Sequence, residues 1–288
     1  MSKDIKIKKG LDIRLKGEAD KTLSNAPRSR TFAIRPSDFH LITPKMVLKE
    51  GEKLQAGDPV FYSRENKDLK FVSPVSGTLT AIERGAKRVI ERIVIEADQQ
   101  DAYKEFGKID VSTADAETIK NRFLEAGCWP FIKQRPYDVI ADAETKPKAI
   151  FVSGYASAPL AADYDFTLKG KEAELQAAVT ALSKLTDGDV HVSIGSSGTS
   201  SFDTLKDITL HKVSGPHPSG NVGTQIGKIN PVNKGETVWT VSAQDLVIIG
   251  ELLLTGKFNA ERIIALAGSS VKNPKYYRTK IGAEVSTF

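Results

Sequence analysis

Short apolar runs separated by polar turns fill the first hundred residues, a pattern that predicts β-strands. The runs at residues 5–7, 31–34 and 60–62 are rich in Ile, Val and Phe, and Gly, Pro and Asp lie between them. Two longer segments, residues 49–61 and 73–82, each combine short apolar runs with Gly and Pro corners. This part of the chain is therefore predicted to consist of β-structure.

Helical and strand patterns alternate after residue 101. Residues 149–153 form a continuous apolar run, which is typical of a strand buried in a parallel sheet. Residues 170–185 repeat apolar side chains at helical spacing, and residues 190–194, 208–213 and 237–241 read as further strands. Because the alternation covers about 150 residues, it predicts a Rossmann-like open α/β sheet.

Local signals predict where two of the helices begin and end. Ser112 opens a capping-box pattern with Asp115, and Gly127 suits the residue that follows a helix. Ser242 is a fitting N-cap for a second helix, and Gly256 would close it.

The last thirty residues begin a third pattern. Residues 261–268 predict a strand and residues 272–274 a turn, and residues 283–288 read as one more strand without a closing element. We therefore expect the chain to be a fragment of a longer protein.

The composition is that of an ordinary soluble domain, with 40% hydrophobic and 27% charged residues and a net charge of +5. The 41 Lys and Arg are scattered, so no nucleic-acid-binding arm is expected. Attraction to an anionic membrane face or an acidic partner stays open. A single cysteine, Cys128, excludes an internal disulfide and a multi-cysteine metal site. The start of the chain has no signal-peptide pattern, and its longest apolar run, residues 246–254, is too short to span a membrane.

Standard catalytic motifs are missing. Residues 195–198 do not form a nucleophile elbow, and residues 223–228 are one residue short of a phosphate-binding P-loop. The chain has four histidines: His40, His191, His211 and His217. No two of them are four residues apart, the spacing that would indicate a metal site on a helix. These absences argue against a stand-alone hydrolase or kinase.

One loop rich in glycine and proline, residues 213–223, follows a predicted strand. Glycines in such a loop can bring backbone amides close to a ligand, or they can serve a tight corner with no ligand. His217 stands between two prolines in this loop. It is a candidate for contact with a ligand or partner, and the alternative is that it caps a turn.

An aromatic and basic cluster follows the first predicted helix. Its candidate site residues are Trp129, Phe131, Lys133, Arg135 and Tyr137. Such a mixture can stack on a flat ring and donate hydrogen bonds to carbonyl oxygens of that ring. The alternative is a loop that packs Trp129 and Phe131 into the core. Cys128, just before the cluster, is interpreted as a packed thiol and not as a nucleophile.

Residues 49–61 and 73–82 together resemble a biotinyl/lipoyl-type barrel sandwich. Carrier domains of this kind bear a prosthetic group on a lysine at a hairpin tip. Neither Lys67 nor Lys70 lies in the sequence setting of a modified lysine. We therefore expect a docking domain without covalent lipoyl or biotin.

Segments along the whole chain resemble the A subunit of the sodium-translocating NADH:quinone oxidoreductases, namely residues 5–13, both sandwich segments, and residues 129–137, 214–224 and 237–241. With the patterns above, the resemblance implies an α/β multidomain fold. Its parts would be a barrel-sandwich domain at residues 1–100, a Rossmann-like α/β domain at residues 101–259, and the start of a truncated β-grasp (SLBB-like) domain at residues 260–288.

The resemblance also implies a function. It places the chain as a peripheral subunit of a sodium-pumping respiratory complex, on the cytoplasmic face of a bacterial inner membrane. Its partners would be integral membrane subunits, and its substrate a quinone, either ubiquinone or menaquinone, bound by the cluster that contains Trp129 and Tyr137. The chain would then be part of an enzyme but inactive in isolation.

Two alternatives remain beside this interpretation. One is a pure assembly module without a small-molecule site. The other is a flavin- and NADH-binding electron-transfer subunit similar to the C subunit of the Rnf complex. At the matching positions, residues 126–130 and 153–159, most phosphate-admitting glycines are missing, and Ala156 and Ala158 stand where that family has carboxylates. The resemblance thus implies that FMN and NADH binding are lost.

Overall fold

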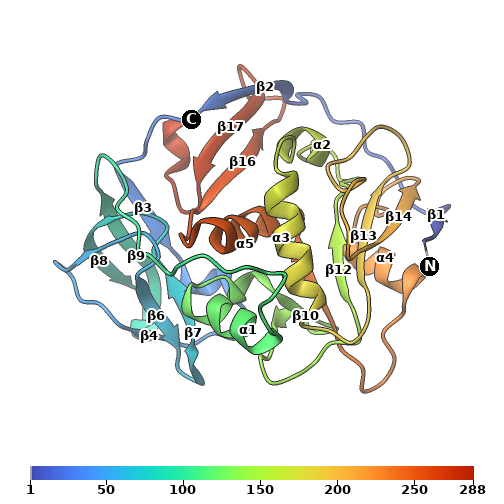
Figure 1. Ribbon diagram of the computed structural model, residues 1–288. Coiled ribbons are helices and arrows are strands. Elements are labelled where there is room, and N and C mark those ends of the chain that lie inside the picture. Colours follow the sequence, from blue (N-terminus) through green and yellow to red (C-terminus); the bar gives the residue numbers. More distant parts are fainter. Residues whose placement is uncertain (1) are drawn as a thin grey trace.

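The computed structural model describes residues 2–288, and the strands within them form four sheets. Figure 1 shows three regions: a β-region on the left, an α/β region on the right and a small sheet at the top. We call them the barrel region, the α/β region and the third sheet. The predicted α/β multidomain fold with an N-terminal barrel sandwich is confirmed.

Two small sheets form the barrel region. One has the order β3 (Thr31–Ile34), β9 (Ile90–Ala97), β8 (Gly77–Arg84) and β5 (Lys53–Leu54), and the other has the order β4 (Pro44–Met46), β6 (Pro59–Ser63) and β7 (Asn66–Val72). Short 3₁₀ turns, η1 (Pro36–Asp38) and η2 (Ala86–Arg88), join some of these strands. Phe61 and Phe71 stack in the interior with ring centroids 4.5 Å apart. Lys67 and Lys70 lie on strand β7 and not at a hairpin tip.

The α/β region is built on one seven-stranded sheet. Its order is β1 (Asp4–Lys6), β14 (Thr209–Ser214), β13 (Val190–Gly195), β12 (Ile150–Ser153), β15 (Val238–Ser242), β10 (Lys133–Arg135) and β11 (Val139–Ile140). The first five strands run parallel, β10 is antiparallel to its neighbour β15, and β11 is antiparallel to β10. The four central strands follow the Rossmann order, because the first of them in the chain, β12, lies between the second, β13, and the fourth, β15.

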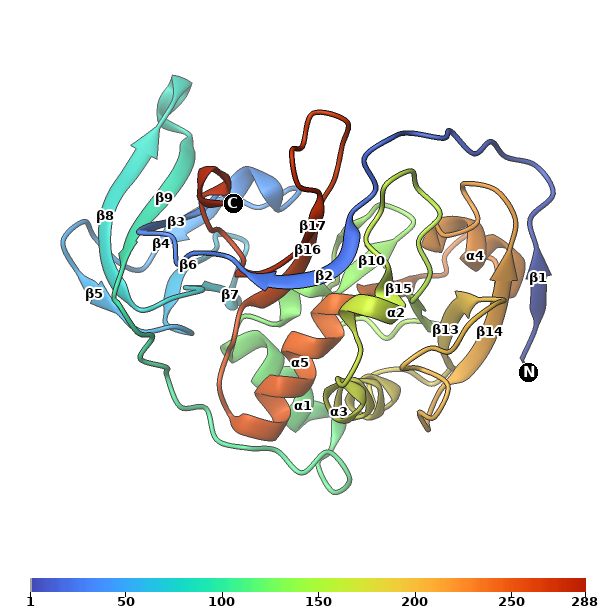
Figure 2. The ribbon, with the colours of Figure 1, turned by 90° about the horizontal axis from the view of Figure 1, so that it is seen from above.

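Helices cover both faces of this sheet, as Figure 2 shows. The helices are α1 (Ala116–Glu125), α2 (Tyr164–Thr167), α3 (Glu172–Ser183), α4 (Val222–Ile229) and α5 (Ala243–Thr255). Helices α3 and α5 pack beside each other over one face, where Ile150 and Val152 of β12 point. Helix α4 covers the other face, where Phe151 of β12 and Ile226 of α4 belong to one apolar cluster.

Most of the predicted helix ends are confirmed. Ser242 accepts a hydrogen bond from the Asp245 N–H at the start of α5, and Gly256 ends that helix with a left-handed backbone. Helix α1 is capped by Asp115, whose side chain accepts from the Thr118 N–H, and not by Ser112. The prediction for Ser112 was wrong because the hydroxyl donates locally to Asp110 in the preceding turn.

The third sheet joins distant parts of the chain. It contains β16 (Glu261–Leu266), β17 (Lys275–Lys280) and β2 (Asp20–Asn25), with β2 parallel to β17. The N-terminal stretch therefore adds β1 to the α/β sheet and β2 to the third sheet before it enters the barrel region. The strand expected at residues 283–288 is wrong, because this segment forms the 3₁₀ turn η4 (Val285–Thr287).

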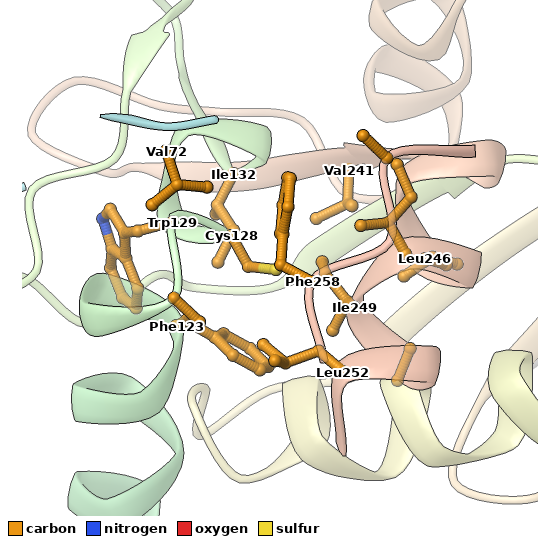
Figure 3. Packing of buried hydrophobic residues seen from close by; sticks show 14 of the residues in the cluster. Val72, Phe123, Cys128, Trp129, Ile132, Val241, Leu246, Ile249, Leu252 and Phe258 are labelled. Carbon is orange, nitrogen blue, oxygen red and sulfur yellow. The ribbon is translucent and has the colours of Figure 1, made fainter. Parts of the chain in front are cut away.

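The main apolar core extends from the barrel region into the α/β region. Figure 3 shows Val72 of β7 beside Cys128 and Ile132, with Phe258 and the side chains of α5 on the other side. The 3₁₀ turn η3 (Trp129–Phe131) lies in this core between α1 and β10. The segment with the predicted aromatic cluster is thus anchored by buried side chains.

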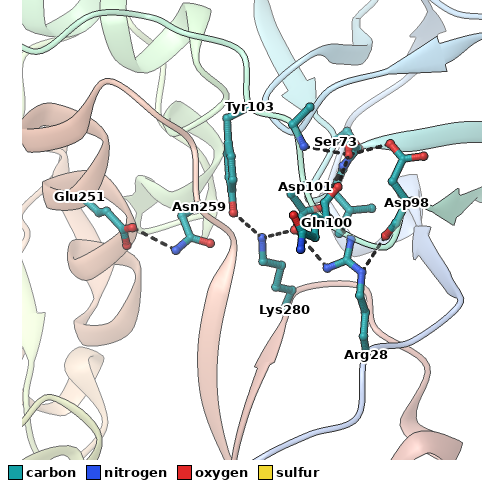
Figure 4. Close-up of polar contacts among 12 residues, drawn as sticks. Arg28, Ser73, Asp98, Gln100, Asp101, Tyr103, Glu251, Asn259 and Lys280 are labelled. Carbon is teal, nitrogen blue, oxygen red and sulfur yellow. Dashed lines mark hydrogen bonds and ion pairs between the residues drawn. The ribbon is translucent and has the colours of Figure 1, made fainter.

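A polar junction ties the barrel region to the third sheet (Figure 4). The Asp101 carboxylate accepts from Arg28 at 2.7 and 3.1 Å, from Lys280 Nζ at 2.7 Å and from the Ser76 N–H at 3.0 Å. Burial opposes ionisation of Asp101, but the hydrogen bonds from Arg28 and Lys280 outweigh it and hold the pKa of this carboxyl below its ordinary value. Asp101 is a buried charge with a full set of partners.

Candidate functional site

The predicted cluster at residues 129–137 does not converge on one point. Trp129 is 1% exposed, and its Nε1 donates to the Ala141 carbonyl at 2.7 Å. Its ring packs edge-on against Trp239, with ring centroids 5.5 Å apart. In this structure Trp129 belongs to the core, as the alternative interpretation held, and has no ring face free for a ligand.

Cys128 lies beside Trp129 and is fully buried. Burial raises the pKa of its thiol, and Asp245 adds to the effect through its negative charge. A buried thiol held in its neutral form is a poor nucleophile. This agrees with the interpretation of Cys128 as a packing residue.

Tyr137 lies at the opposite extreme and is 77% exposed in the turn between β10 and β11. It lines none of the cavities described below. Trp129 and Tyr137 therefore do not share a surface, because one end of the cluster turns into the core and the other turns into solvent.

Phe131, Lys133 and Arg135 do come together. They line a cavity of about 680 Å³ that also touches the ends of β12 and β15 and the first turn of α4. The strand order reverses between β12 and β15, and ligands of open α/β sheets bind at the carboxyl ends of strands at such a reversal. We call this cavity the switch-point pocket.

Some charged side chains around the switch-point pocket have an ion-pair partner and one does not. Arg135 Nε lies 3.3 Å from Asp138 Oδ1, and Asp245 is paired with Arg262. Lys133 makes no ion pair within residues 2–288. Burial lowers the pKa of Lys133, although the charges of Asp138 and Asp245 act in the opposite direction. The pocket therefore holds one partly desolvated cation without its own counter-ion.

A second cavity of about 690 Å³ lies where the three regions meet, and we call it the interdomain groove. Phe39 and Phe71 line it from the barrel region, Phe131 and Phe258 from the α/β region, and Ile281 from the segment after β17. Most of its wall is apolar, and a few charged side chains such as Arg35 and Arg92 also reach it.

Phe131 lines both cavities, and it stacks on Phe258 with ring centroids 6.3 Å apart. The Lys133 ammonium group lies 5.8 Å from the ring centroid of Phe39, within reach of a cation–π contact. Phe131 and Lys133 thus stand at the boundary between the apolar interdomain groove and the polar switch-point pocket.

The glycine- and proline-rich loop at residues 213–223 is mainly a tight corner. A Cβ on Gly215 would lie 2.1 Å from the Ile7 carbonyl oxygen, and one on Gly220 would lie 2.4 Å from the Ser157 nitrogen. These two glycines therefore allow backbones to approach each other. Gly223 differs, since it lines the switch-point pocket and a Cβ there would meet nothing within 4 Å.

His217 lies in the same loop but lines neither of the two cavities. Its Nδ1 is 3.1 Å from the Ser157 hydroxyl, and its backbone N–H donates to Asp12 Oδ1 at 2.9 Å. These contacts link the loop to the segment after β12 and to the N-terminal stretch. Contact of His217 with a ligand or partner stays a prediction.

Sequence reasoning missed two polar features of the sheet. Thr240 on β15 lines the switch-point pocket, although the sequence predicted it only as part of a strand. His191 and His211 are both buried on the neighbouring strands β13 and β14, with His211 Nε2 3.1 Å from His191 Nδ1. The sequence did contain a signal for this histidine pair, because each of two consecutive predicted strands has one histidine. Within residues 2–288, no group of His, Cys, Asp and Glu side chains is arranged to hold a metal ion.

Comparison with known proteins decides the family. The model of the NqrA second alpha/beta domain matches residues 114–258, the model of the NqrA N-terminal barrel-sandwich hybrid domain matches residues 5–98, and that of the NQRA C-terminal domain matches residues 263–288. The chain belongs to the NqrA family. The resemblance inferred from the sequence is thereby confirmed.

Curated relatives agree with this assignment. The A subunit of the Na(+)-translocating NADH-quinone reductase of Saccharophagus degradans is 32% identical over 283 residues, covering 98% of this chain and 63% of the relative. The corresponding proteins of Neisseria meningitidis serogroup A and Yersinia pseudotuberculosis are each 34% identical over 284 residues, covering 98% of this chain and 64% of the relative. The chain thus spans less than two thirds of the length of these NqrA relatives. No helix in residues 2–288 is both long and apolar enough to cross a membrane.

Proposed function

We propose that this NqrA-family chain is the peripheral, quinone-associated part of the A subunit of a sodium-pumping NADH:quinone oxidoreductase. The relatives are named for a Na(+)-translocating NADH-quinone reductase, and that name supports the reaction class. In this proposal the chain lies at the cytoplasmic face of the bacterial inner membrane, docked on integral membrane subunits. It takes part in the enzyme as one subunit, with no complete reaction of its own.

The observation that carries the quinone proposal is the interdomain groove. A quinone headgroup is a flat, largely apolar ring with two carbonyl oxygens. Ligand sites of this kind are mostly apolar cavities with a few well-placed polar groups. The groove has about 690 Å³ of space, and five phenylalanines line it: Phe32, Phe39, Phe71, Phe131 and Phe258. It is large enough and apolar enough to take a quinone ring and the first part of its tail.

Lys133, which lines the adjoining switch-point pocket, would give this site a polar end. Its ammonium group lies 5.8 Å from the centroid of Phe39, which lines the groove. A partly desolvated cation close to a quinone oxygen would stabilise negative charge that develops on that oxygen during reduction. Of the predicted cluster, Phe131 and Lys133 keep the proposed quinone role, whereas Trp129 contributes by holding η3 in the core.

A titration with a short-chain soluble quinone, followed by intrinsic tryptophan fluorescence, tests the proposal. The parent chain should show saturable quenching with quinone and none with NADH. Phe39→Ala should weaken quinone binding about tenfold, because it removes roughly 1.4 kcal/mol of apolar contact. Phe166→Ala is a matched control, since Phe166 is also half-buried and packs on Tyr276 outside the groove.

Three results would contradict the proposal. No saturable response to quinone would favour the pure assembly module. An equal loss of quinone affinity in the Phe39 and Phe166 variants would show that the groove is not the site. A yellow protein that quenches with NADH would instead favour the flavin-binding, Rnf-type alternative.

A further inference from the structure

We propose that the switch-point pocket binds the phosphate group of a small ligand, held by backbone amides of the first turn of α4, the Thr240 hydroxyl and the side chains of Lys133 and Arg135. This site goes beyond the proposed quinone function. It shares Phe131 with the interdomain groove, and its donors come from the sheet and from α4.

Strand register brings the sheet residues of this pocket together. Lys133 of β10 lies directly opposite Thr240 of β15 in an antiparallel pair, so both side chains leave the same face of the sheet. Arg135 lies two residues further along β10 and shares that face. Thr240 is also in register with Phe151, whose side chain packs in the cluster under α4. The two cations and the hydroxyl therefore lie on the α4 face of the sheet.

The first turn of α4 supplies two free amides beside them. The N–H groups of Val222 and Gly223 have no hydrogen-bond acceptor within residues 2–288, and the side chain of Asn221 does not cap the helix. Both residues line the pocket. The partial positive charge of a helix N-terminus and its unpaired N–H groups together suit an oxyanion.

Thr240 provides independent support for a ligand. It is only 5% exposed, it lines the pocket, and its hydroxyl forms no hydrogen bond with any other residue in the part of the chain that the structure describes. Polar groups of residues this deeply buried usually have a hydrogen-bond partner. A phosphate oxygen in the pocket would accept from this hydroxyl.

The charge pattern favours an anion over a cation. Asp138 and Asp245 also line the pocket, but each already faces an arginine, Arg135 and Arg262 respectively. Lys133 is left as the unmatched charge. Arg135 Nε is buried and makes no well-aligned hydrogen bond, even though Asp138 is 3.3 Å away. A phosphate group would form charge-assisted hydrogen bonds with both cations.

Isothermal titration of the parent chain with inorganic phosphate, AMP and adenosine tests the proposal. Inorganic phosphate and AMP should bind saturably, and adenosine should not, because it lacks the phosphate. Tighter binding of AMP than of phosphate would identify a phosphorylated organic ligand. Equal affinities would identify free phosphate. Saturable binding of adenosine as tight as that of AMP, or no binding of phosphate and AMP at millimolar concentration, would overturn the proposal.

Two sets of variants separate this site from a general effect on folding. Thr240→Val keeps the shape of the side chain and should weaken phosphate binding about tenfold, while the melting temperature stays equal or rises. Gly223→Asp would place a carboxylate at the mouth of the pocket and should abolish phosphate binding. Gly223→Asn, which has the same size without the charge, should keep binding within about threefold. Unchanged phosphate affinity in Thr240→Val or in Gly223→Asp would overturn the assignment.

The same variants distinguish this proposal from the quinone proposal. Thr240→Val should leave quinone affinity unchanged, and Phe39→Ala should leave phosphate affinity unchanged, because Thr240 lines only the pocket and Phe39 lines only the groove. A loss of both affinities in Thr240→Val would contradict two separate sites.

Discussion

Asp101 and Lys133 are both partly buried charges at region boundaries, yet their surroundings differ completely. Asp101 accepts hydrogen bonds from Arg28, Lys280 and the Ser76 N–H, and its pKa is held below the ordinary value (Figure 4). Lys133 has no ion pair within residues 2–288, and burial lowers its pKa. A fully partnered charge stabilises the fold, whereas an unpartnered one at a cavity is a candidate for ligand binding.

Removal of Asp101 should have the largest effect on stability. Asp101→Ala leaves Arg28 and Lys280 without their shared partner at the junction of the barrel region and the third sheet. Loss of one member of a buried ion pair typically costs about 3–5 kcal/mol. Urea unfolding followed by circular dichroism measures the loss. Arg30→Ala, which removes an exposed pair with Glu96, is the control and should cost less than about 1 kcal/mol.

The pH dependence of Asp101 adds a second check on the same junction. Because its pKa is lower in the folded chain, the stabilisation is complete above the ordinary pKa of 3.8 and is lost as pH falls through the folded pKa. The Asp101→Ala variant should lack this acid-induced loss. A stability difference between parent and variant that does not shrink at low pH would contradict the role given to Asp101.

The buried histidine pair should produce an intermediate effect. The Lys3 N–H donates to His211 Nδ1, so His211 Nε2 carries the proton that it donates to His191 Nδ1. Burial, together with smaller effects of the charges of His191 and Lys3, lowers the pKa of His211 to about 4 against the opposing effect of Asp189. Burial lowers the pKa of His191 as well. The pair is therefore stable only in its neutral form.

Since the folded pKa of His211 lies below the ordinary value of 6.5, its stabilisation is complete above pH 6.5 and falls as pH drops toward 4. The expected loss is on the order of 2–3 kcal/mol, because each pKa unit is worth about 1.4 kcal/mol. Unfolding in urea at pH 7 and pH 4.5 measures it. His211→Gln should reduce the loss, and the exposed His40→Gln should not. Equal losses in both variants would contradict this account.

Replacement of Lys133 should have the smallest effect on stability. Lys133→Met keeps the apolar stem and removes the partly desolvated charge, so the free energy of unfolding should change by less than about 1 kcal/mol, or rise. The same urea experiment as for Asp101 checks this. A loss of about 3 kcal/mol or more would mean that Lys133 is a structural charge like Asp101, and the contrast between the two would fail.

Local signals in the sequence predicted local structure well. Ser242 and Gly256 bound α5 as expected, because a cap depends on a few neighbouring residues. The Rossmann-like sheet followed from its buried apolar runs. Helix α4 was missed because prolines and glycines dominate the loop before it and Gly223 and Gly227 lie within it. The pairing of β1 with β14 joins residues about 200 positions apart, which no local pattern encodes.

The candidate site was predicted only in part, for a physical reason. The 3₁₀ turn η3 interrupts the alternation of side chains, so Trp129 enters the core while Lys133 and Arg135 of β10 face a cavity. A linear cluster of aromatic and basic residues cannot show where that turn falls. The donors of the switch-point pocket come from three separate segments, β10, β15 and α4, and only the fold assembles them.

Quinone titration of Lys133→Met beside the parent chain tests the central claim most directly. The account predicts that the variant binds quinone about tenfold more weakly, because a cation next to the quinone oxygen is lost, while its stability is unchanged or higher. Unchanged quinone affinity, or a weaker affinity that comes with a matching loss of stability, would contradict the claim that this unpartnered charge is held for a ligand.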